Sequence, residues 1–174
     1  MLAVIAAVAL GQQSRPELGP AIVRYCESNL KKQVGRGECS DLALGALKLM
    51  GVSTRLPEDE PAPGDYVWGT PVYRVWMEGG KAKEWPDSGG RKAVKPGDIV
   101  QLRDVEISWR NGNAYGQQFY PHHTSVVASV GKDGLKWTVF EQNSNGRRYV
   151  VKNDMDVANM KKGYFTVYRV EKAN

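Results

Sequence analysis

The chain has 174 residues, of which 41% are hydrophobic, as is typical of one globular domain with a core of ordinary size. Its formal net charge of +5 makes it moderately basic. The lysines and arginines are scattered and form no long basic run interleaved with aromatic residues, so we predict no nucleic-acid partner.

An uninterrupted apolar run opens the chain, from Met1 to Gly11. It is too short to cross a bilayer and ends in small residues, as a secretory signal peptide does, although no Lys or Arg precedes it. A start codon further upstream and a first helix docked in the core are the alternatives. We predict a signal peptide over residues 1–11, one domain over residues 12–174, a secreted or periplasmic (cell-envelope) location, and no stable membrane insertion.

Two helices are predicted in the first third of the chain. Apolar residues recur at helical spacing between residues 15 and 34, with prolines in or before the first turn, and the glycines of residues 35–37 end this helix. A second apolar pattern covers residues 42–50. It stops at Gly51, a residue suited to the left-handed conformation just past a helix end.

Cys39 stands where the glycine-rich loop gives way to the second predicted helix. Unpaired backbone N–H groups and the positive end of the helix dipole favour a thiolate there, which is what a nucleophile needs. The alternative is a small buried hydrophobe, as free cysteines usually are. Cys26 falls within the first helical pattern. A disulfide with Cys39 would consume the reactive thiol, so we predict that Cys26 is a core residue and is not bridged.

The middle of the chain, from residue 53 to residue 94, is rich in proline, glycine and acidic residues. It predicts an irregular connection, with short strands or an ordered loop at residues 66–69 and 72–76. A loop of this length is usually functional and is expected to form a wall of a substrate groove.

After residue 96 the pattern changes to short β-branched and aromatic runs, over residues 99–102, 124–130, 137–143, 149–151 and 164–170. Residues 131–134 and 143–146 have the composition of hairpin turns. Helices followed by a meander of antiparallel strands predict an α+β fold.

The chain has two histidines, His122 and His123, side by side where a strand is predicted to begin. Adjacent residues of a strand point to opposite faces, so at most one can face a given groove. In the next strand, Glu141 and Asn143 share one face and Gln142 lies on the other. Neighbouring strands can thus place a carboxylate or amide beside a histidine, which orients the base that a thiol nucleophile requires.

The order of these features resembles the CHAP family of cysteine, histidine-dependent amidohydrolases/peptidases, over residues 20–170. The resemblance rests on Cys at a helix start, Lys-Pro-Gly-Asp-Ile-Val at 95–100, His followed by Thr-Ser-Val-Val at 124–127, and Glu-Gln-Asn at 141–143. It implies a papain-like α+β domain in which N-terminal helices pack on a small antiparallel β-sheet or half-barrel. It also implies cleavage of amide or peptide bonds, most often in peptidoglycan, without a metal or organic cofactor.

Carried over by position, Cys39 is the nucleophile, His123 the base, Glu141 its orienting partner and Asn143 an auxiliary polar group. The family usually has glycine before the histidine, where this chain has His122. The choice between the two histidines therefore stays open on the motif alone.

Strand phase favours His123. It shares a face with Ser125 and Val127, which is small and apolar and is expected to pack against the helix that begins at Cys39. The oxyanion of the reaction is expected to bind the Cys39 backbone N–H and one further donor, with Gln142, Asn143 and Tyr25 as candidates.

Two other functions stay open. One is a papain-like module without turnover that binds cell wall or protein. The other is a peptidyl or acyl transferase, which uses the same residues with an amine in place of water. For the enzyme we expect a monomer acting on peptidoglycan or another peptide substrate.

Overall fold

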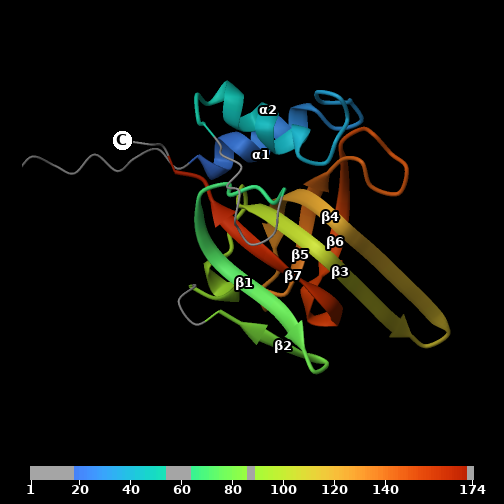
Figure 1. Cartoon of the computed structure of the whole chain (residues 1–174). Coiled ribbons are helices and arrows are strands. Elements are labelled where there is room, and N and C mark those ends of the chain that lie inside the picture. Colours follow the sequence, from blue (N-terminus) through green and yellow to red (C-terminus); the bar gives the residue numbers. More distant parts are fainter. Residues whose placement is uncertain (1–17, 54–63, 86–88, 172–174) are drawn as a thin grey trace, which may run out of the picture.

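The computed structural model describes residues 18–53, 64–85 and 89–171 (Figure 1). The predicted signal peptide and the acidic, proline-rich run at residues 57–63 lie outside these segments. In the described segments, neither α1 nor α2 has the length or the apolar run needed to cross a membrane.

Helix α1 (Gly19–Ser28) starts at the predicted prolines but ends six residues earlier than predicted. The Ser28 hydroxyl and the Asn29 amide both donate to the Tyr25 carbonyl at 2.8 Å. Such side chains compete with the helical hydrogen-bond pattern and end helices. Lys31 then adopts a positive φ of 63°, which turns the chain toward the sheet.

Helix α2 (Asp41–Leu49) ends as the sequence predicts. Gly51 has a φ of +66°, and its N–H donates to the Lys48 carbonyl at 3.1 Å. The Val52 N–H donates to the Leu47 carbonyl at 2.9 Å, which completes a Schellman cap. Ser40, directly after Cys39, occupies the N-cap position of α2, and its side chain makes no capping hydrogen bond.

In the part of the chain that the structure describes, seven antiparallel strands form one sheet in the order β2-β1-β7-β3-β4-β5-β6. The strands are β1 (Thr70–Glu78), β2 (Lys81–Glu84), β3 (Ile99–Asn111), β4 (Ala114–Val130), β5 (Lys136–Glu141), β6 (Val151–Asp156) and β7 (Met160–Arg169). Two short 3-10 helices, η1 (Arg91–Ala93) and η2 (Val157–Asn159), lie between them. The predicted turns at residues 131–134 and 143–146 connect β4 to β5 and β5 to β6.

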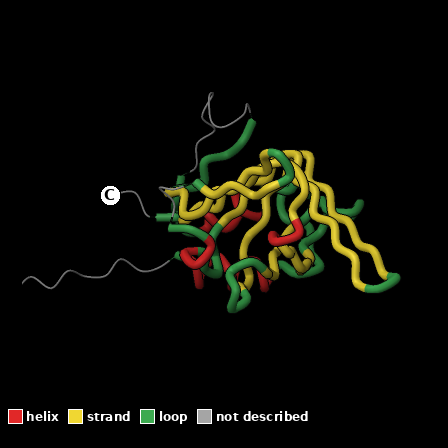
Figure 2. Tube along the Cα trace, turned by 90° about the horizontal axis from the view of Figure 1, so that it is seen from below, coloured by secondary structure: helices red, strands yellow, loops and turns green. Residues whose placement is uncertain are grey.

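The predicted fold class, N-terminal helices packed on a small antiparallel sheet or half-barrel, is wrong. The sheet is the larger part of the molecule, and the two helices of ten and nine residues cover one end of it (Figure 1). The segment from residue 53 to residue 94, predicted as mainly irregular, contributes β1 and β2. The hairpin of β3 and β4 is also far longer than predicted, with 13 and 17 residues, and it projects from the body (Figure 2).

The two faces of the sheet support two separate cores. On one face, the helices pack against strand residues that include Ile99, Val126 and Phe140. On the other face, a second cluster contains their sequence neighbours Val100 and Val127. The helices therefore lie on the face to which Val126 points, whereas Val127 points into the second core.

Candidate active site

The candidate site lies where strands β4 and β5 part. Their register runs from Val130↔Trp137 to Val126↔Phe140. Toward its start, β4 continues to His123 and beyond, whereas β5 ends at Glu141. The loop that leads into α2 fits against this opening, because its Cys39 thiol interacts with the backbone of Thr124.

Cys39, His123 and Glu141 form one hydrogen-bonded chain. The Cys39 thiol is hydrogen-bonded to the His123 ring. His123 Nε2 lies 3.2 Å from Glu141 Oε2, which leaves Nδ1 as the ring nitrogen that faces the sulfur. His123 is 5% exposed and Glu141 is fully buried, whereas Cys39 is half-buried and accessible. The structure thus brings together the predicted nucleophile, base and orienting carboxylate.

The electrostatics of these three residues favour a charged thiolate–imidazolium pair. Burial alone raises the pKa of Cys39, but the hydrogen bond and charge of His123, with the backbone of Thr124 and Ser40, hold that pKa below its usual value. Burial lowers the pKa of His123, whereas its hydrogen bonds to Cys39 and Glu141 and their charges raise it to about 9. Both shifts therefore favour the thiolate–imidazolium pair over the neutral thiol and imidazole.

Glu141 is held in its ionised form by several donors. Burial raises the pKa of this carboxyl, but the hydrogen bond to His123 and the imidazolium charge lower it below its usual value. The Ser125 hydroxyl donates to Oε2 at 3.4 Å, and the Asn153 amide donates to Oε1. Asn153, on β6, was not predicted, since only the pairing of β5 with β6 brings it beside Glu141.

Asn143 lies near the site but does not contact His123 or Cys39 through a hydrogen bond. Its side chain is exposed and donates to Glu38 Oε2 at 3.0 Å. Its φ of +57° matches its place at the start of the predicted turn. An auxiliary role for Asn143 would thus act through Glu38, the residue directly before the thiol.

Two of the candidates for the second oxyanion donor lie elsewhere. The Gln142 amide donates to the Val34 and Glu38 carbonyls, at 2.9 and 2.7 Å. The Tyr25 hydroxyl lies against Gly45 at the contact between α1 and α2. The Cys39 backbone N–H is therefore the expected donor for which the described segments show no competing role.

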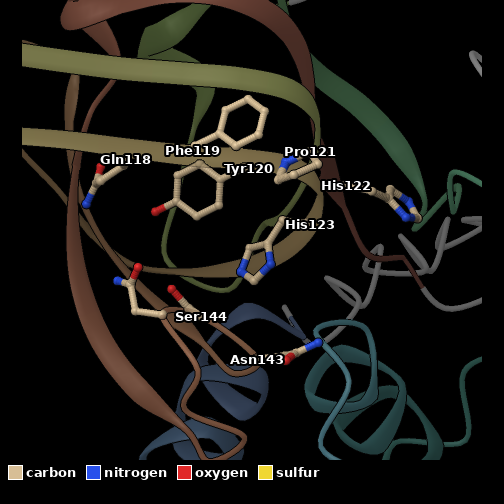
Figure 3. Close-up of a pocket in the computed structure, with 9 residues that line it drawn as sticks. Gln118, Phe119, Tyr120, Pro121, His122, His123, Asn143 and Ser144 are labelled. Atoms are coloured by element: carbon tan, nitrogen blue, oxygen red, sulfur yellow. The ribbon is translucent and has the colours of Figure 1, made fainter.

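His122 belongs to a different cluster. Its side chain points away from His123 (Figure 3), and its Nε2 lies 3.0 Å from Asp65 Oδ1. Asp65 is fully buried and also accepts hydrogen bonds from Arg103 and, at 3.0 Å, from the Tyr164 hydroxyl. Burial and the Arg103 charge lower the pKa of His122, and Asp65 only partly offsets them.

The strand-phase prediction grouped the right residues but placed them on the wrong face. His123, Ser125 and Val127 do share one face, yet that face turns toward the second core, and Val126 packs against the helices. His123 meets Cys39 because β4 and β5 have parted at this level, which lets the loop before α2 reach across the opening.

A cavity of about 120 Å³ adjoins His123 (Figure 3). The Tyr120 ring stacks obliquely on the imidazole, with 5.1 Å between centroids, and Phe119 is 60% exposed at the rim. The cavity is lined by Gln118, Phe119, Tyr120, Pro121, His122, His123 and residues 143–145.

Cys26 lies in the core between the helices and the sheet, fully buried, and both cysteines carry free thiols. Burial and the nearby charge of Glu27 raise the pKa of Cys26 to about 12, so this thiol is unreactive. Over residues 18–53, 64–85 and 89–171, no three His, Cys, Asp or Glu side chains gather as metal ligands would.

The chain is similar to one family of known proteins and to a curated relative. The model of a family described as "AIM3/BBC1 Cysteine proteinase-fold domain" matches residues 10–174. A relative from Debaryomyces hansenii, "Altered inheritance of mitochondria protein 3", is 26% identical over 156 residues, which are 87% of this chain but only 16% of that protein.

Two solved structures are also similar to this chain. They are titled "The crystal structure of Ly7917" and "The crystal structure of Ly7917 with the hydrolyzing product of MDP", and they are 21% and 20% identical. Each has a TM-score of 0.49 and covers 86% of this chain and 62% of its own. A likeness of this degree says nothing about substrate.

Proposed function

Since the chain belongs to the AIM3/BBC1 cysteine proteinase-fold family, we propose that it is a thiol hydrolase that cleaves amide bonds through Cys39, His123 and Glu141. One observation carries the proposal. A half-buried thiol with a lowered pKa is hydrogen-bonded to a histidine that a buried carboxylate orients, next to a cavity. A merely structural cysteine needs none of these features.

The proposed reaction has two steps. The Cys39 thiolate attacks the amide carbonyl carbon and forms a C–S bond, and the carbonyl oxygen becomes an oxyanion that the Cys39 N–H stabilises. The C–N bond then breaks as the imidazolium of His123 gives its proton to the leaving amine. Water next attacks the thioester and gives a proton to His123, and the C–S bond breaks to release the carboxylic acid and the thiolate.

Glu141 supports both steps without giving up its own charge. It holds His123 Nε2 and so keeps Nδ1 directed at the sulfur. All three groups come from one copy of the chain, so we propose a monomer as the active form.

Two narrower proposals rest on the sequence alone. Peptidoglycan peptides are the first substrate to test because of the resemblance to CHAP enzymes, and export is proposed from the apolar residues 1–11. The chain spans 16% of the length of its Debaryomyces relative. Any activity of such a longer protein is therefore a separate proposal with its own test.

The test compares the wild-type protein with Cys39→Ala and Cys26→Ala on labelled peptidoglycan and on a peptide library, with products identified by mass. Cys26→Ala removes a thiol outside the site and controls for the loss of a cysteine. We expect new carboxyl termini from the wild type and Cys26→Ala and none from Cys39→Ala. Equal release by Cys39→Ala, or no release by the wild type, would contradict the proposal.

The same assay separates hydrolysis from transfer. Adding an amine acceptor diverts the thioester to a new amide if the protein is a transferase. Products that keep a free carboxylate at high amine concentration are expected from a hydrolase.

A further inference from the structure

Gln142 is a fully buried polar side chain that the proposed mechanism does not use. It lies between Glu141 and Asn143 in sequence, yet its partners are more than a hundred residues away. Its Oε1 accepts from the Val34 N–H at 3.1 Å, and its Nε2 donates to the Val34 carbonyl at 2.9 Å. Nε2 also donates to the Glu38 carbonyl, at 2.7 Å.

The bond to the Glu38 carbonyl bears directly on the nucleophile. That carbonyl and the Cys39 N–H belong to the same peptide unit. The peptide bonds of the described segments are all trans, and in a planar trans peptide the C=O and N–H bonds point in opposite directions. Gln142 holds the Glu38 carbonyl on its own side, and the Asp41 N–H donates to the same carbonyl at 3.1 Å. The Cys39 N–H therefore points away from Gln142.

That N–H is available for a substrate. Within the described part of the chain it donates to no backbone or side-chain acceptor. The preceding peptides of the loop are held from the other side, because Asp41 Oδ2 accepts from the Arg36 and Glu38 N–H groups at 2.7 and 3.1 Å. The loop is thus held on one side by Asp41 of helix α2 and on the other by Gln142, which directly follows strand β5.

We propose that Gln142 is a positioning residue that aims the Cys39 N–H at the carbonyl oxygen of the scissile amide. This inference rests on the proposed function and deepens it. Gln142 acts through the Glu38–Cys39 peptide and does not itself donate to the oxyanion, since its N–H groups are bound to two carbonyls.

The test replaces Gln142 by methionine, which has similar volume and no hydrogen-bonding amide. The control is Ile22→Val, a change in the core between the helices and the sheet that mildly lowers stability without touching the site. Three quantities are measured: kcat and KM for a peptide substrate, the inhibition constant of a peptide aldehyde that adds to the thiol, and the rate of Cys39 alkylation by iodoacetamide.

An oxyanion donor that is badly aimed slows only steps that form an oxyanion. For Gln142→Met we expect kcat to fall by about 10- to 100-fold with KM nearly unchanged, and aldehyde inhibition to weaken by a similar factor. Alkylation forms no oxyanion, so its rate should stay within about threefold of the wild type. Ile22→Val should keep all three values.

Unchanged kcat in Gln142→Met, or an alkylation rate that falls in parallel with kcat, would overturn the inference while leaving the proposed function standing. No turnover by the wild type would overturn the proposed function and this inference with it. If Gln142→Met does not fold, Gln142→Glu is measured in its place, because it keeps the shape of the side chain but removes both N–H donors. The expected result is the same: kcat and aldehyde inhibition fall while the alkylation rate is nearly unchanged.

Discussion

Replacing Glu141 by glutamine is expected to narrow the pH range of activity from both sides. The amide has the shape of the carboxylate and can still accept a hydrogen bond from the Ser125 hydroxyl, but it carries no charge. His123 then loses one of the two anionic partners that raise its pKa.

The size of the effect follows from the geometry. Two unit charges 3.2 Å apart interact by about 5 kcal/mol at an effective dielectric constant near 20, which is an upper limit for the loss. The amide still accepts a hydrogen bond from His123, so we expect a loss of about 2 kcal/mol. This corresponds to about a 30-fold smaller population of the thiolate–imidazolium pair relative to the neutral pair.

The assay is the pH profile of kcat/KM. In the wild type, the acid limb follows Cys39, whose pKa lies below its usual value, and the alkaline limb follows His123, whose pKa is about 9. Without the Glu141 charge, His123 gives up its proton at a lower pH, so the alkaline limb of the profile shifts to lower pH. The imidazolium that stabilises the Cys39 thiolate is then less populated, so the acid limb shifts to higher pH.

Asp154→Asn is the matched control, because it removes a carboxylate from the neighbouring strand β6, where Asp154 accepts a hydrogen bond from Thr138. Its profile should match that of the wild type. The reasoning is refuted if Glu141→Gln leaves both limbs in place, or if Asp154→Asn moves them equally.

Two further predictions concern residues around the site. His123→Ala should lose about a hundredfold or more in kcat/KM, which is the scale of a general base. His122→Ala should keep most of the activity, because His122 is bound to Asp65. The reverse order of losses would show that His122 is the base. Arg103→Met removes a partner of the fully buried Asp65 and should lower the free energy of unfolding in urea by about 3 kcal/mol. A loss within about 0.5 kcal/mol, the range of an ordinary surface substitution, would show that the pair is not structural.

Local sequence features predicted the parts of the site that depend on neighbours in the chain. The helix start beside Cys39 follows from glycines and an apolar periodicity, and its Gly51 end is confirmed. The alternation along a strand correctly put Glu141 and Gln142 on opposite faces, and the structure gives them separate partners.

Features set by long-range pairing were missed. In β3, the alternating burial of Val105 and Ile107 signals a strand, but a bulge at Asp104, with a φ of +52°, interrupts the period, so the long hairpin was not predicted. The face of β4 that meets the helices could not be predicted, since both Val126 and Val127 are apolar and fully buried, each in a different core.

The rate of Cys39 alkylation by iodoacetamide as a function of pH, read by peptide mass with Cys26 as an internal reference, tests the central claim most directly. It needs no substrate. We predict that the Cys39 rate levels off at a lower pH than that of an ordinary thiol, because His123 holds the pKa of Cys39 below its usual value, and that buried Cys26 stays unmodified. A Cys39 rate that climbs steadily toward pH 9, like that of an ordinary thiol, would contradict a catalytic thiolate–imidazolium pair.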